Sequence, residues 1–164
     1  MKLKKLIDCN KTLGDLEITG ITCDSRQVKE RYAFVCIKGA LSDGHNYAQT
    51  ALEQGAAVVI AERDLGLKNQ IVVENTHEEF ARLSAKWFGN PSKKLKLIGV
   101  TGTNGKTSTT YMIKQILETL GHKVGLIGTI QNMIGDEVIP TSNTTPNAYD
   151  LNALFADMVE KGCD

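Results

Sequence analysis

Residues 99–108 read Gly-Val-Thr-Gly-Thr-Asn-Gly-Lys-Thr-Ser, and a mostly apolar run at residues 95–98 precedes them. This order predicts a buried strand, a glycine-rich loop and a helix, which together form a cradle for phosphate groups. Glycine at positions 102 and 105 allows a left-handed backbone, so successive N–H groups can point into one hollow. The stretch therefore predicts an α/β fold that binds a nucleotide at the start of a helix.

The polar residues of this loop supply the charge and the metal ligand that a triphosphate needs. We expect Lys106 to offset phosphate charge and to act in catalysis, and Thr107 to hold Mg²⁺ through its hydroxyl. ATP and Mg²⁺ are therefore the expected ligands, and an ordinary glycine-rich turn is the alternative. The predicted ATP-binding residues are Gly102, Thr103, Asn104, Gly105, Lys106, Thr107 and Ser108.

Composition limits the classes of protein to consider. The chain has 164 residues, 41% of them hydrophobic, and a net charge of zero, which suits one ordinary domain or two small ones and gives no general attraction to nucleic acid. No stretch has the length of a signal peptide core or of a membrane span, so we expect a cytoplasmic protein with no membrane partner. The four cysteines are scattered, which favours reduced thiols over zinc ligands or disulfides.

A turn-rich basic stretch at residues 89–94 predicts a domain boundary, which gives domains at residues 1–90 and 91–164. Apolar runs in the first domain predict short buried strands, and apolar periodicity predicts helices between and after them. The expected strands are residues 32–37, 57–61 and 71–73, and the expected helices are residues 45–54 and a segment that a capping box opens at Thr76. The first domain is therefore a small α/β domain.

The second domain is expected to begin a doubly wound parallel sheet, with a strand–helix–strand unit at residues 95–100, 106–120 and 123–127. The helix carries an apolar face that we expect to cover the sheet, formed by Met112, Ile113, Ile116, Leu117 and Leu120. A hairpin at residues 134–139 and a helix at residues 147–161 follow. A further strand is expected after this helix, so the domain looks cut off.

The glycine loop departs from the general phosphate-loop pattern, because Val100 stands six residues before Lys106, where that pattern has glycine. The tighter form Thr-Gly-Thr-Asn-Gly-Lys-Thr resembles the nucleotide loop of the Mur ligases and of their folylpolyglutamate synthetase relatives. In the first domain, residues 21–26, 34–39, 43–45 and 55–59 look like the UDP-sugar-binding N-terminal domain of two Mur ligases. Residues 125–130 and 143–146 are similar to the members that add the third amino acid of the peptidoglycan stem.

This resemblance implies ATP-dependent amide formation on UDP-N-acetylmuramoyl-L-alanyl-D-glutamate through an acyl phosphate. The partners would be this UDP-N-acetylmuramoyl-dipeptide and an amino acid, either diaminopimelate or lysine, and the enzyme would be a monomer. By the same resemblance, the UDP-substrate contacts would be Ser25, Ser42, His45, Asn143, Thr144 and Thr145. The complete enzyme would have three domains, of which these residues contain the first and the beginning of the second, so we expect this piece alone to be inactive.

Two other functions remain open on the sequence. One is another ligase of the same superfamily, such as a folylpolyglutamate synthetase, although that relative lacks a UDP-binding N-terminal domain. The other is a nucleotide-binding module without catalytic activity.

Overall fold

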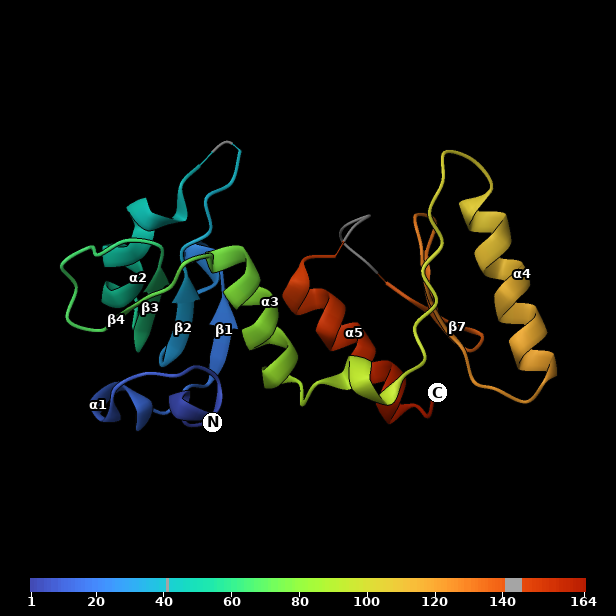
Figure 1. Ribbon diagram of the computed structural model, residues 1–164, viewed down its shortest axis with the longest axis horizontal. Coiled ribbons are helices and arrows are strands. Elements are labelled where there is room, and N and C mark those ends of the chain that lie inside the picture. The colour runs from blue at the N-terminus through green and yellow to red at the C-terminus, as the bar shows by residue number, and fades with distance from the viewer. Residues whose placement is uncertain (41, 141–145) are drawn as a thin grey trace. The chain divides into compact units, whose positions relative to one another are not determined.

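The computed structural model describes residues 1–40, 42–140 and 146–164. It divides the chain into two compact units, Met1–Trp87 and Phe88–Asp164, each with its own sheet (Figure 1). Among the described residues, no helix combines the length and the apolar character that a bilayer crossing requires.

Unit 1 is built on a parallel sheet whose strand order is β1-β2-β3-β4. Every residue of β3 is buried, as expected for a strand covered on both faces. The strands at β2, β3 and β4 confirm the expected α/β pattern, whereas β1 was not predicted. The bounds are β1 Gly20–Thr22, β2 Tyr32–Val35, β3 Val58–Ala61 and β4 Gln70–Val72.

Helices supply the apolar side chains that cover this sheet. Phe34 and Val59 pack in one buried cluster with Ala48 and Ala51, which lie on α2. Their spacing on α2 puts the two alanines on one helix face. The expected helix at residues 45–54 is a 3₁₀ turn, η3, followed by α2. The helical segments of unit 1 are η1 Leu3–Lys5, α1 Lys11–Gly14, η2 Ser25–Gln27, η3 Gly44–Tyr47, α2 Ala48–Glu53 and α3 Thr76–Trp87.

The start of α3 differs in detail from the capping box expected at Thr76. Asn75 precedes the helix, and its Oδ1 accepts a hydrogen bond of 3.1 Å from the backbone N–H of Glu78. Thr76 is the first helical residue, and its backbone N–H donates a hydrogen bond to the carboxylate of Glu62. The helix therefore has two oxygen acceptors at its N-terminus, and its Phe80 and Leu83 are buried.

Unit 2 contains two long helices and a short antiparallel meander. Residues 132–139 form the expected hairpin, in which Gly135 turns the chain with a φ of 58°. The helices α4 and α5 lie where their apolar periodicity predicts them. The bounds are η4 Pro91–Lys94, α4 Lys106–Thr119, β5 Gly125–Ile127, β6 Asn132–Ile134, β7 Glu137–Ile139 and α5 Ala148–Glu160.

The expected parallel strand–helix–strand unit is wrong for this part of the chain. Residues 95–100 belong to no strand, and β5 pairs antiparallel with β6. Lys96 donates its backbone N–H to the carbonyl of Asp164 at 2.7 Å. A central parallel strand needs a hydrogen-bonding neighbour along each edge, and no described strand runs beside residues 95–100.

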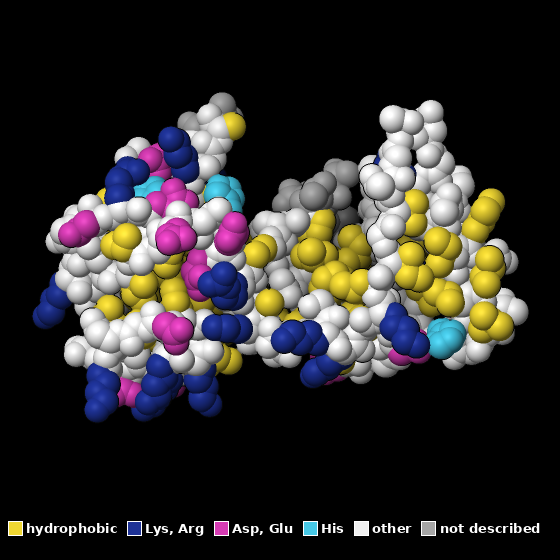
Figure 2. Space-filling model, viewed as in Figure 1, with side chains coloured by type: hydrophobic (Ala, Val, Ile, Leu, Met, Phe, Trp, Pro, Cys, Tyr) yellow, Lys and Arg dark blue, Asp and Glu magenta, His cyan; other side chains and the backbone are white. Residues whose placement is uncertain are grey.

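The predicted apolar face of α4 is only half buried. Ile113 and Leu117 line a cavity of about 480 Å³ together with residues 95–100, β5 and α5. By contrast, Met112, Ile116 and Leu120 are 63%, 60% and 70% exposed. Leu97 and Ile98 are exposed as well, and Figure 2 shows hydrophobic side chains at the surface of unit 2. Helix α4 therefore turns only part of its apolar face, Ile113 and Leu117, toward the cavity.

The loop after β2 is fixed by Asp43 and Gly44. Asp43 caps η3, because its Oδ1 accepts a 3.0 Å bond from the backbone N–H of His45. Gly44 donates its N–H to the carbonyl of Ile37 at 2.9 Å. The backbone here is so close that a Cβ atom at position 44 would lie 2.7 Å from Ile37 O and 2.8 Å from Ile37 N.

Asp43 is also an electrostatic anchor. Its carboxylate accepts hydrogen bonds from the backbone N–H of His45, from the His45 ring and, at 3.3 Å, from Nη2 of Arg63. These bonds, the backbone one first, lower the pKa of Asp43 from 3.8 to about 2. The ionised carboxylate is thus favoured by folding.

We predict that Gly44→Ala lowers the free energy of unfolding by about 1–3 kcal/mol, because the added methyl group meets backbone atoms that cannot rotate away. Urea unfolding followed by circular dichroism measures the change. Gly39→Ala is the matched control from the same loop, since its Cβ would lie 3.4 Å from the nearest atom, Ser42 O, an ordinary contact. Equal stability of the two variants would contradict the close approach at Gly44.

We predict an acid-dependent contribution of Asp43 to stability. Because folding lowers its pKa from 3.8 to about 2, the stabilisation is fully present above the ordinary pKa and is lost as the pH falls through that interval. Asp43→Asn should therefore lower Tm at neutral pH, and the Tm difference from the wild type should close as the medium is acidified. Asp8→Asn, at an exposed carboxylate of the same unit, is the control. A Tm difference that is constant with pH would refute this contribution.

Candidate functional site

The glycine loop of unit 2 has the backbone geometry that a phosphate cradle requires. Gly102 and Gly105 have φ angles of 148° and 78°, which confirms the left-handed conformations expected there. Gly105 is the N-cap residue of α4 and offers no side chain to the first turn of the helix. Loop residues 101–106 are exposed. The first amides of α4 therefore have no side-chain cap at the positive end of its dipole.

Lys106 folds back over this loop. Its ammonium group donates to the carbonyl of Gly102 and, at 3.4 Å, to the carbonyl of Thr103. Thr107 follows at the second position of the helix and is half-buried, whereas Ser108 is exposed. The first turn of α4 contains no acidic residue. One cation thus lies at this loop, beside the first amides of α4, which no side chain caps.

This donor set fits ATP and Mg²⁺. An anion is stabilised where amides and a lysine converge without a competing carboxylate, and the hydroxyl of Thr107 adds a hard oxygen ligand. The cavity of about 480 Å³ in the same unit is a different place, because none of residues 101–109 lines it, and its lining is mainly apolar. The loop, rather than that cavity, carries the chemistry of a nucleotide site.

A second candidate site lies along the carboxyl edge of the unit 1 sheet, where the four parallel strands all end. Ser25 follows β1 and is the first residue of η2. Asp24 caps this turn, since its Oδ1 accepts a 3.0 Å bond from the backbone N–H of Arg26. The Arg26 guanidinium also bonds Asp24, and this side-chain bond is the main reason that the pKa of Asp24 is lowered. Ser25 is thereby held half-buried at the edge of the sheet.

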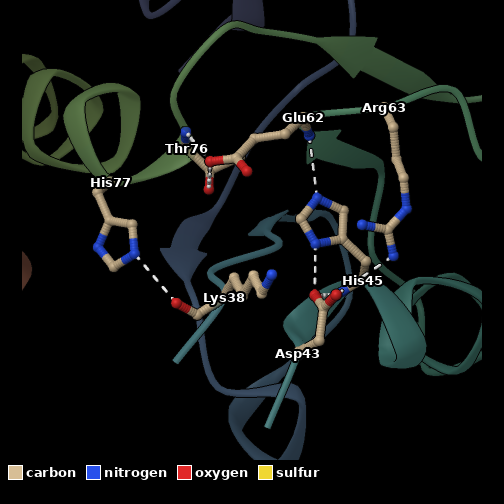
Figure 3. Close-up of polar contacts among 7 residues, drawn as sticks. All are labelled: Lys38, Asp43, His45, Glu62, Arg63, Thr76 and His77. Atoms are coloured by element: carbon tan, nitrogen blue, oxygen red, sulfur yellow. Dashed lines mark hydrogen bonds and ion pairs between the residues drawn. The ribbon is translucent and has the colours of Figure 1, made fainter. Parts of the chain in front are cut away.

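Ser42 and His45 follow β2 at the same edge but have different surroundings. Ser42 is exposed, and its carbonyl accepts the backbone N–H of Gly39 at 2.9 Å. The His45 side chain is fully buried. Its Nδ1 is 2.5 Å from Oδ1 of Asp43, and its Nε2 accepts the backbone N–H of Glu62 at 3.0 Å (Figure 3). Both ring nitrogens thus have partners within the chain, and the ring supports the loop.

Sequence reasoning missed Glu62, the polar residue that follows β3. The Glu62 carboxylate accepts two bonds of 2.9 Å, from the N–H and the hydroxyl of Thr76. These bonds lower the pKa of Glu62, the backbone one first. His77 donates from Nε2 to the carbonyl of Lys38 at 3.3 Å. A search for polar residues directly after each buried strand would have found Glu62, because parallel strands bring such residues to one edge.

The remaining predicted substrate contacts are Asn143, Thr144 and Thr145, and they lie outside the described residues. On either side of them, β7 ends at Ile139 and Asn147 caps α5.

Family models match both parts of the chain. The model described as "Mur ligase family, catalytic domain" matches residues 17–91, which include Ser25, Ser42 and His45. The model described as "Mur ligase middle domain" matches residues 100–164, which include the glycine loop.

Curated relatives align over nearly the whole chain. One from Caldanaerobacter subterraneus subsp. tengcongensis is 48% identical over 151 residues, which is 90% of this chain and 31% of the relative. Another from Bacillus cereus is 46% identical and covers 100% of this chain and 35% of the relative. Both are named UDP-N-acetylmuramoyl-L-alanyl-D-glutamate--2,6-diaminopimelate ligase. The chain spans about a third of the length of these relatives.

Solved structures agree on the fold. A structure of a UDP-N-acetylmuramoyl-L-alanyl-D-glutamate--2,6-diaminopimelate ligase superposes with a TM-score of 0.80 at 24% identity, over 99% of this chain and 34% of that one. A MurF structure from Acinetobacter baumannii has a TM-score of 0.52 at 26% identity and covers 85% of this chain and 27% of its own. Since two models of one family match adjacent parts of this chain, and relatives of that family align along it, the chain belongs to the Mur ligase family.

Proposed function

We propose that this chain is the N-terminal part of a ligase that uses ATP to join 2,6-diaminopimelate to UDP-N-acetylmuramoyl-L-alanyl-D-glutamate. The amino acid is taken from the names of the relatives. The single observation that carries the proposal is the uncapped, lysine-bearing glycine loop at the start of α4. We further propose that residues 1–90 form the UDP-substrate domain and residues 91–164 the beginning of the ATP domain, and that the complete protein is a monomer.

The reaction needs ATP because a carboxylate is a poor acylating agent. The D-glutamyl carboxylate attacks the γ-phosphorus of ATP, the bond to ADP breaks, and an acyl phosphate forms. The amine of the incoming amino acid then attacks the acyl carbon, phosphate leaves, and the nitrogen loses a proton. In the first step an anion must approach a polyanion, so charge compensation governs its rate.

The loop residues supply that compensation. Backbone amides of residues 102–108 hold phosphate oxygens, and the helix dipole of α4 favours their negative charge. The Lys106 ammonium leaves the carbonyls of Gly102 and Thr103, which are weaker partners than a phosphate, and pairs with the transferring group. Mg²⁺ bound with the help of Thr107 would neutralise further phosphate charge.

The carboxyl edge of the unit 1 sheet holds the UDP portion of the substrate in this proposal. Hydroxyl groups at Ser25 and Ser42 are suitable partners for uracil, ribose or diphosphate oxygens, and open α/β sheets bind ligands at this edge. Asn143, Thr144 and Thr145 are proposed to contact the muramoyl-dipeptide.

Ligation by the complete protein tests this function, with 2,6-diaminopimelate and lysine compared as acceptors. We expect ADP release and UDP-tripeptide formation with the first amino acid. Lys106→Ala should lower kcat by about 10²–10³-fold, since one transition-state contact to a developing charge is lost, and should leave the KM for the UDP-substrate unchanged. Lys93→Ala, at an exposed lysine of η4, is the control. Near-normal turnover of Lys106→Ala would reject the role of this loop.

Ser25→Ala should weaken binding of the UDP-substrate and leave ATP binding unchanged, because Ser25 and the glycine loop belong to separate units. Loss of one hydrogen bond corresponds to a roughly tenfold higher Kd. Isothermal titration of the complete protein with each ligand measures both constants. Thr50→Ala removes an exposed hydroxyl of α2 and should change neither. If Ser25→Ala weakened both ligands equally, the site would be misassigned.

A further inference from the structure

The loop between β2 and η3 is held by a closed circuit of polar contacts (Figure 3). From Asp43 at the end of the loop, the circuit runs through the His45 ring to the backbone of Glu62. It continues through the Glu62 carboxylate to Thr76, and the next residue, His77, donates to the carbonyl of Lys38 at the start of the loop. We name this circuit the loop bracket; it comprises Lys38, Asp43, His45, Glu62, Thr76 and His77.

The protonation of His45 follows from its two partners. The backbone N–H of Glu62 is a donor under all conditions, so Nε2 must present its lone pair to it. An imidazolium has no lone pair, and the ring is therefore neutral. Its proton is on Nδ1, which donates to the carboxylate of Asp43.

Burial makes this arrangement rigid. The His45 side chain and Thr76 are completely buried, so a broken bond in the bracket would leave a polar group without water. Arg63 adds a third bond to Asp43, from the partly exposed side of the carboxylate. The bracket thus joins the loop to the ends of two structural elements, β3 and α3.

The loop contains an exposed serine, Ser42, next to Asp43. A β-bridge joins Lys38 to Asp43, and Gly39 N–H bonds Ser42 O within it. Ser42 is exposed and adjacent in sequence to Asp43, the residue that His45 holds. One peptide unit therefore separates Ser42 from the residue that the His45 ring contacts.

We propose that His45 is a positioning residue: as a neutral ring protonated at Nδ1, it holds Asp43 against the Glu62 backbone and so presents the loop that carries Ser42 to the UDP-substrate. The inference rests on the proposed function, because Ser42 serves a ligand only if this edge binds one. His45 itself touches no substrate.

Nuclear magnetic resonance tests the ring state directly in the complete protein labelled with ¹⁵N-histidine. The signals of His45 are assigned by their loss in His45→Gln. We expect a protonated Nδ1 and an unprotonated Nε2 at neutral pH. A protonated Nε2, in either a neutral or a charged ring, would overturn the proposal, since Glu62 N–H would then have no acceptor.

Steady-state kinetics test the positioning role. His45→Phe keeps a planar ring but neither bond, and it should raise the KM for the UDP-substrate at least about tenfold with kcat and the KM for ATP unchanged. His45→Gln keeps one donor and one acceptor but cannot span both partners. Its KM for the UDP-substrate should therefore lie between the values of His45→Phe and the wild type. Leu83→Ala, which removes a buried side chain of α3, is the matched control for lost stability and should leave all three constants unchanged below its Tm.

The outcomes separate the two proposals. An unchanged KM in folded His45→Phe, or a parallel change in kcat and both KM values, overturns the positioning role while wild-type ligation still supports the proposed function. If the wild type neither binds nor ligates the UDP-substrate, the proposed function fails and this inference fails with it. If His45→Phe does not fold, the His45→Gln kinetics and the ring tautomer decide the matter.

Discussion

The parallel direction of all four strands in unit 1 determines where its polar side chains meet. Because β1, β2, β3 and β4 end at the same edge, residues as far apart in sequence as Ser25 and Thr76 lie along one line of loops. The bracket around His45 exists only because β3 delivers Glu62 to this edge beside the loop after β2.

Local sequence patterns predicted most elements of both units but not the sheet of unit 2. Apolar runs and helical periodicity depend on neighbouring residues, so β2, β3, α4 and α5 could be predicted from the sequence alone. Strand pairing depends on distant residues. Residues 95–100 have the composition of a buried strand, yet no described strand lies beside them. Strand β5 pairs instead with β6, the strand that follows it along the chain. Met112 and Ile116, on the predicted apolar face of α4, are exposed.

The two candidate sites differ in how far the sequence could predict them. The glycine loop is contiguous, so its left-handed glycines and the helix that begins at Lys106 were predicted from spacing alone. The surroundings of His45, by contrast, are formed by residues from separate segments of the chain. Its motif predicted a substrate contact, but the partners that bury its ring, above all Glu62, are brought to it only by the sheet. The residues around His45 alone do not reveal these partners, because the strand order of the sheet determines which segments meet.

The strand order of unit 1 has a consequence for its synthesis. Each strand pairs with the one that precedes it along the chain, so no strand waits for a later partner before it can add to the sheet. Chains emerge from the ribosome at about 5–20 residues per second, and domains generally fold as units as they emerge. The sheet edge with Ser25 and the bracket can therefore assemble before the second unit has emerged in full, so the first unit needs no part of the second for its own sheet.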